Sequence, residues 1–73
     1  MYSKNECGLC EKAERTIRRI QQETDLNLTI VDIEDDAGAY GRYKDRIPVV
    51  VVEGREVASA PIDEARLRAA LTA

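Results

Sequence analysis

Cys7 and Cys10 constrain this chain more than any other feature, because they are its only cysteines and lie three residues apart. An amphipathic helical pattern opens directly behind them. Two thiols at positions i and i+3 at the start of a helix can close a small disulfide ring. The first thiol then sits over the unpaired N–H groups of the first turn, where the helix dipole favours an anion. This environment lowers a thiol pKa and creates a nucleophile, so the pair indicates redox chemistry.

Two other interpretations of the cysteines are a zinc half-site and a pair of inert thiols. Zinc takes four N or S ligands, and the chain has no histidine and no third cysteine. A zinc ion would need thiolates shared across a dimer, or carboxylates in their place. A purely structural bridge is also a weak device, since a four-residue loop restricts the unfolded chain by only ~2 kcal/mol. We therefore expect no metal and favour the redox interpretation, with both alternatives open.

The length and composition predict one small acidic domain that covers residues 1–73. With no Phe or Trp and only three Tyr, aliphatic side chains must fill its core. The net charge of −3 argues against a general nucleic-acid binder, which carries a basic surface. No apolar run approaches the ~20 residues of a membrane span, and the N-terminus lacks a signal-peptide pattern. Together with cysteines spaced for chemistry, these features predict a soluble cytoplasmic protein.

The first third of the chain predicts a short strand followed by a helix. Met1 to Ser3 is typical of the end of a strand, and the polar residues 4–6 form the loop into the helix. The helix is predicted over about Gly8 to Gln22, where one apolar stripe recurs at helical period. The members of this stripe, all expected to face the core, are Leu9, Ala13, Ile17 and Ile20.

The middle of the chain predicts a strand and a poor helix. Apolar side chains alternate from Leu26 and continue to Ile33, which indicates a strand that is buried over its second half. The acidic residues 34–36 suit the start of a helix, and a cation site is the alternative. A short helix is predicted over 37–43, with Tyr40 and Tyr43 on one side and in the core.

The next segment predicts a β-hairpin. Val49 to Val52 are four β-branched residues in a row, which favours a strand covered on both faces. Pro48 should be the first residue of this strand, because proline cannot donate to a ladder. After a turn at 53–55 the chain returns as a second strand over 56–58.

A last helix is predicted around 62–71, capped by Ser59 or Asp63. The order of elements is then β-α-β-α-β-β-α, with the CxxC motif at the first strand-to-helix junction. This order resembles the thioredoxin superfamily. The resemblance implies an α/β fold with a four-stranded mixed sheet flanked by helices, in which the first strand is short.

Within that superfamily the chain resembles a short glutaredoxin-like family along essentially its whole length. The CxxC motif paired with Ile47-Pro48-Val49, about forty residues later, carries most of the resemblance. The matching segments are Tyr2 to Cys10, Tyr40 to Val49, and Pro61 to Leu67.

The resemblance implies a role for each residue around the sulfurs. Cys7 would be the attacking thiol, and it should also be the more exposed one because it sits at the helix cap. Cys10, one turn inside the helix, would be the resolving thiol. The Ile47–Pro48 bond would be cis and lie beside the sulfurs, although most X–Pro bonds are trans. The exposed Ile47 backbone could then pair with the backbone of a thiol substrate.

The glutathione site of the family has few counterparts in this chain. Lys4 lies where a partner of the glutathione carboxylate is expected, and Ser59 and Asp63 are the polar candidates for the γ-glutamyl end. Glu6, beside Cys7, opposes thiolate formation by like-charge repulsion. We therefore predict no bound cofactor and retain glutathione as a candidate co-substrate.

These features predict a thiol-disulfide oxidoreductase that uses Cys7 and Cys10 on a protein or low-molecular-weight disulfide. Glutathione or a reductase would be the electron donor. The alternative is a non-enzymatic thioredoxin-fold binding module whose thiols are inert or hold a metal across a dimer. Neither a nucleic acid nor a membrane is an expected partner.

The predicted first strand is short for its place in the sheet. In a thioredoxin-like sheet it is central, yet the polar loop leaves only Met1 to Ser3 for it, against the usual five or six residues. We therefore expect either strand residues upstream of Met1 or a weak homodimer that pairs along the gap.

Overall fold

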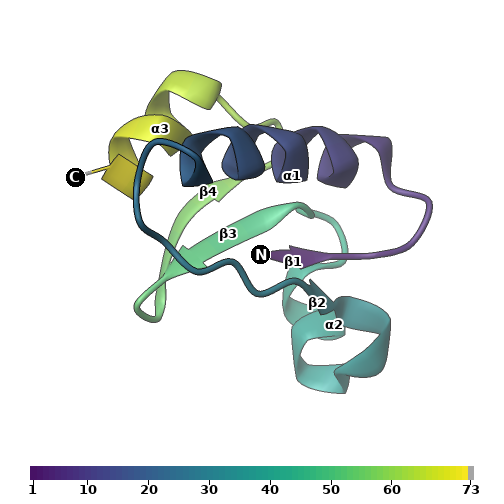
Figure 1. Ribbon diagram of the computed structural model, residues 1–73. Helices are drawn as coiled ribbons and strands as arrows, with labels where there is room; N and C mark the ends of the chain where they lie inside the picture. Colours follow the sequence, from purple (N-terminus) through teal and green to yellow (C-terminus); the bar gives the residue numbers. More distant parts are fainter. Residues whose placement is uncertain (73) are drawn as a thin grey trace.

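The computed structural model describes residues 1–72 and has the predicted order of elements, with one additional 3-10 turn. Figure 1 shows α1 and α3 over one face of the sheet and α2 at the other side. No helix within these residues is long and apolar enough to cross a membrane. The elements are β1 (Tyr2–Ser3), α1 (Gly8–Gln21), β2 (Val31–Asp32), η1 (Ile33–Asp35), α2 (Ala37–Tyr43), β3 (Val49–Val52), β4 (Arg55–Ser59) and α3 (Glu64–Thr72).

The four strands form one mixed sheet in the order β2-β1-β3-β4, so β1 is central as predicted. Tyr2 pairs with Val31 of the parallel strand β2 and with Val49 of the antiparallel strand β3. The amino group of Met1 donates to the carbonyl oxygen of Thr29 at 2.7 Å, which continues the pairing one residue beyond the strand. The short strand therefore has neighbours on both sides.

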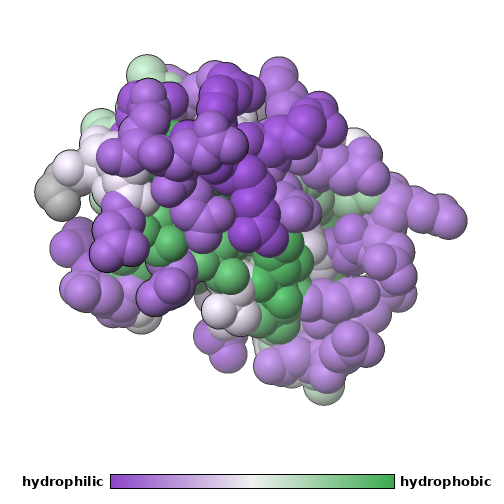
Figure 2. All heavy atoms as spheres, in the orientation of Figure 1, coloured by the Kyte–Doolittle hydropathy of each residue, from purple (hydrophilic) through white to green (hydrophobic). Residues whose placement is uncertain are grey.

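The predicted strand over 26–33 is wrong in its first half. β2 contains only Val31 and Asp32, and residues 26–30 have no regular structure. Because β1 is so short, the segment before Val31 has little neighbouring strand with which to form a ladder. Ile30 is 39% exposed, and Figure 2 shows apolar side chains at the surface along the segment that leads to β2.

The sheet separates two small cores because successive side chains of β3 point to opposite faces. Val50 packs beneath α1 and α3, and Val49 packs towards α2. Both are buried, so the prediction of a strand covered on both faces is confirmed for its first half. The buried residues of the first core are Met1, Ala13, Ile17, Val50 and Leu67, and those of the second are Ile33, Ala39, Tyr43 and Val49.

Two residues predicted to lie in the core are exposed. Tyr40 is 47% exposed, because α2 is short and Tyr43 takes the core position, with its ring 4.6 Å from that of Tyr2. Leu9 is 58% exposed, although it lies on the face of α1 that buries Ala13 and Thr16. Across from Leu9 the chain leaves a cleft in place of a packed neighbour.

Candidate active site

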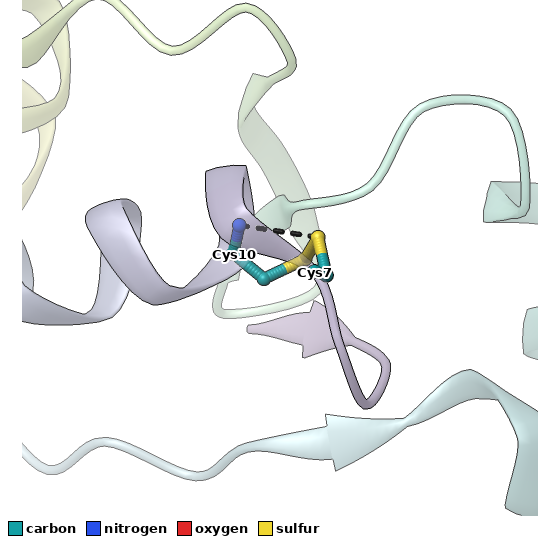
Figure 3. Close-up of a disulfide and its surroundings, with 2 residues drawn as sticks. All are labelled: Cys7 and Cys10. Atoms are coloured by element: carbon teal, nitrogen blue, oxygen red, sulfur yellow. Dashed lines mark hydrogen bonds between the residues drawn. A yellow bond between two sulfur atoms is a disulfide. The ribbon is translucent and has the colours of Figure 1, made fainter.

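Cys7 and Cys10 form a disulfide at the start of α1, with their Cα atoms 5.2 Å apart (Figure 3). Cys7 is the N-cap residue of the helix, in extended conformation with φ −118° and ψ 102°. Its Sγ accepts a hydrogen bond from the backbone N–H of Cys10 at 3.2 Å. The carbonyl oxygen of Cys7 accepts the N–H of Glu11 at 3.0 Å, the first bond of the helical ladder. The first sulfur therefore occupies the cap position that the sequence indicates.

The two sulfurs differ in accessibility in the predicted direction. Cys7 is partly exposed, whereas Cys10 is buried with 4% of its surface accessible. A helix N-terminus favours a negative charge at its cap, so reduction would place a thiolate of Cys7 where the dipole stabilises it. Glu6 has a φ of 55°, a left-handed conformation that turns the chain from the β1 loop into the helix.

The Ile47–Pro48 peptide bond is cis, as the family resemblance implies. Pro48 is buried and immediately precedes β3, which begins at Val49, one residue later than predicted. Because Val49 pairs with Tyr2, the proline lies alongside the end of β1, from which the chain continues to Cys7. Contact between the Pro48 ring and the Cys7 sulfur stays a prediction.

A second cis bond, Ala60–Pro61, was not predicted. The pairing of Val49 with Ser59 and a 3.1 Å hydrogen bond from the Ala60 N–H to the Arg46 carbonyl oxygen bring the two cis segments together. The sequence carries no signal for this bond, because an X–Pro pair is trans by default and the family resemblance concerned only the first proline.

Ser59 and Asp63 line one cavity of about 230 Å³ between β4 and α3. Ser59 ends β4 and is half-buried. Asp63 is the cap of α3, because its Oδ1 accepts the backbone N–H groups of Ala65 at 2.9 Å and Arg66 at 3.3 Å. Neither cysteine is among the residues that line this cavity.

The remaining predicted site residues lie elsewhere. Lys4 is exposed in the loop after β1, and Ile47 is half-buried before β3. The structure thus brings Ser59 and Asp63 together but places Lys4 and Ile47 outside their cavity. Over residues 1–72, no group of three His, Cys, Asp or Glu side chains could hold a metal ion.

Leu9 is the site feature that sequence reasoning missed. It was assigned to the core stripe of α1, but it forms part of a cleft of about 120 Å³ that also includes Pro61 and Ile62. The available signal was its position in the chain between the two cysteines, at the start of the helix.

The comparisons with known proteins agree with this fold. The family model described as Glutaredoxin-like domain (DUF836) matches residues 1–72. Uncharacterized protein Mb0520 of Mycobacterium bovis and Uncharacterized protein Rv0508 of Mycobacterium tuberculosis are each 29% identical to this chain over 68 residues, which covers 86% of it and 70% of the relative. No solved structure matches the chain with statistical significance. The mixed sheet and three helices are those of a thioredoxin-like fold, and the chain belongs to the glutaredoxin-like domain family.

Proposed function

We propose that this protein is a thiol-disulfide oxidoreductase whose reactive pair is Cys7 and Cys10. The observation that carries the proposal is the position of the Cys7 sulfur at the cap of α1, partly exposed and 3.2 Å from the N–H of Cys10. A helix N-terminus and a nearby N–H donor both favour a thiolate over a thiol. Membership of the glutaredoxin-like family supports the same chemistry.

In the reductive direction, the Cys7 thiolate attacks one sulfur of a substrate disulfide. The substrate S–S bond breaks, and the departing substrate thiolate takes a proton from solvent. The Cys10 thiolate then attacks the Cys7 sulfur, which forms the Cys7–Cys10 disulfide and releases the second substrate thiolate. Two electrons pass from the protein to the substrate, and an external thiol such as glutathione, or a reductase, returns them.

The surrounding residues would bind the substrate. The Ile47 backbone, ahead of the cis proline Pro48, would pair with the backbone of the substrate. Ser59 and Asp63 share a cavity that would take the γ-glutamyl end of glutathione, with Lys4 near its other carboxylate. Asp63 already accepts two backbone N–H groups of α3, which weakens its claim as a ligand. A cytoplasmic location would keep the dithiol reduced between turnovers.

The direct test is NADPH consumption with 2-hydroxyethyl disulfide, coupled either to glutathione and glutathione reductase or to thioredoxin reductase. We expect turnover in at least one of the two systems, and the active system identifies the class of electron donor. The Cys10→Ser variant should still form a mixed disulfide at Cys7, visible by mass spectrometry, whereas Cys7→Ser should not.

Alkylation separates this proposal from the non-enzymatic binding module. In the reduced protein, iodoacetamide should modify Cys7 before Cys10, and its rate should rise with pH at values well below the ~8.5 of an ordinary thiol. Two thiols that react only near pH 8.5, together with no turnover in either coupled assay, would favour the binding module.

A further inference from the structure

Arg46 connects α2 to the segment that carries the cis proline before β3. Its N–H donates to the carbonyl oxygen of Tyr43, the last residue of α2, at 2.8 Å. Its own carbonyl oxygen accepts the N–H of Ala60 at 3.1 Å, which bonds it to the segment after β4. The backbone of Arg46 is therefore held on two sides, directly before the bond between Ile47 and Pro48.

The side chain of Arg46 also has two partners. Its Nη1 donates to Oε2 of Glu56 on β4 at 2.6 Å, and its Cζ lies 5.5 Å from the centroid of the Tyr43 ring. Tyr43 is buried, and its ring lies 4.6 Å from that of Tyr2 in the central strand β1. Arginine suits this place because its planar guanidinium can lie over an aromatic ring and donate to a carboxylate at the same time. The side chain thus links β4 to the buried aromatic pair.

The backbone that follows Arg46 is available to a partner. Within residues 1–72, neither the N–H nor the carbonyl oxygen of Ile47 makes a hydrogen bond to another backbone group. Because Val49 pairs with Tyr2, Ile47 lies at the edge of the sheet from which the chain continues to Cys7. Unpaired backbone groups at such an edge can pair with an extended peptide.

We propose that Arg46 is a positioning residue for the proposed reaction, and that it fixes the Ile47 backbone for pairing with the peptide backbone of a substrate. The inference rests on the proposed function, because it concerns the substrate that reacts with Cys7. A backbone that is fixed before binding loses less conformational entropy when the substrate pairs with it. The consequence is a preference for disulfides that carry a peptide backbone over disulfides that carry none.

The ion pair of Arg46 is better suited to orientation than to stability. The side chains of Arg46 and Glu56 are 43% and 35% exposed, and exposed ion pairs contribute little to the free energy of unfolding. Loss of the Arg46 side chain should therefore leave the fold intact but release the segment before Pro48. Arg68 offers a matched control, because its side chain is 46% exposed and binds Glu23, which joins α3 to the turn after α1.

The test compares two mixed disulfides of thionitrobenzoate, one with a capped Ala-Cys-Ala peptide and one with mercaptoethanol. The peptide has only small side chains and no charge, so it differs from mercaptoethanol chiefly in its backbone. The Cys7 thiolate of the reduced protein attacks the peptide or mercaptoethanol sulfur and forms a new S–S bond with it. The original S–S bond breaks, and the coloured thionitrobenzoate anion leaves.

The readout is the ratio of the two second-order rate constants, peptide over mercaptoethanol, divided by the same ratio for dithiothreitol. Dithiothreitol has no backbone, so the division removes the difference in chemical reactivity between the two compounds. We expect a ratio of about ten for the wild-type protein, the factor that one net hydrogen bond of ordinary strength carries.

The variants separate positioning from a general loss of structure. Arg46→Ala should lower the ratio towards one and leave the rate with mercaptoethanol unchanged. Glu56→Gln should lower the ratio less, because the guanidinium keeps its place over Tyr43, and Arg46→Lys should also be intermediate, because lysine keeps only the charge. Arg68→Ala should keep the wild-type ratio. If thermal melting shows that Arg46→Ala does not fold, Glu56→Gln tests the inference by itself.

A wild-type ratio of one, or a ratio that Arg46→Ala and Glu56→Gln leave unchanged, would overturn the inference. An equal fall of both rate constants in Arg46→Ala would also overturn it, because Arg46 would then have a structural role only. Turnover of 2-hydroxyethyl disulfide separates the two proposals. Turnover with an unchanged ratio removes only the role of Arg46, whereas no turnover in either coupled assay removes the proposed function as well.

Discussion

Leu9 and Ile17 lie eight residues apart on the inner side of α1, yet Leu9 is 58% exposed and Ile17 only 2%. Ile17 shares a core cluster with Met1, Val50 and Leu67 from three other parts of the chain. Leu9 faces a cleft, because the chain opposite it does not close on the helix. The same apolar pattern therefore supports the core at one end of α1 and lines an open cleft at the other.

The largest expected effect is a loss of activity on substitution of Cys7, at the exposed end of α1. We expect Cys7→Ser to lower turnover of 2-hydroxyethyl disulfide on the order of 10³-fold or more, because the reaction loses its nucleophile. Serine is itself a good N-cap, so the unfolding free energy of the reduced protein should change little. Thermal melting of reduced wild type and variant is the control, and a large fall in melting temperature would mean that Cys7 has a structural role instead.

A substitution at the buried end of α1 should have the opposite result: it should lower the stability of the protein and leave its activity unchanged. Ile17→Ala should lower the unfolding free energy by about 2–4 kcal/mol, because it leaves a cavity in the core. Urea denaturation followed by circular dichroism measures this change. At low temperature, where the variant remains folded, its turnover of 2-hydroxyethyl disulfide should equal that of the wild type. A stability loss below about 1 kcal/mol would contradict the packing of Ile17.

Thr16 lies between Leu9 and Ile17 on α1, so its substitution should have an intermediate effect on the unfolding free energy. Thr16→Val keeps the shape of the side chain and removes the hydrogen bond to Glu64, at a cost of about 1 kcal/mol. The same denaturation experiment measures it, with Glu64→Gln as the variant that retains an acceptor. If Thr16→Val were as stable as the wild type, the bond would not tie α1 to α3.

The smallest effect on stability should come from Leu9 itself. Leu9→Ala should change the unfolding free energy by less than about 0.5 kcal/mol, because the side chain is already in water and alanine favours a helix. A loss of more than about 1 kcal/mol would place Leu9 in the core and remove the contrast with Ile17.

Local sequence patterns were enough to predict the elements whose conformation depends mainly on their own residues. The bounds of α2 agree with the prediction, β3 begins one residue later than predicted, and α1 ends one residue earlier than expected. The helical stripe and the run of valines act over a few residues, through side-chain periodicity and β-branching. The position of the CxxC motif at the start of α1 was predictable for the same reason. The cis bond before Pro48 was predicted from the family resemblance.

The sequence by itself therefore determined the order of elements and the position of the two cysteines at a helix cap, and the family resemblance added the central place of the short first strand. Only the tertiary structure decided that residues 26–30 form no strand, that Leu9 borders a cleft, and that Ser59 and Asp63 share a cavity. Each of these features depends on what lies opposite a residue in space. A strand needs a partner of sufficient length, and an apolar side chain is buried only where another segment covers it.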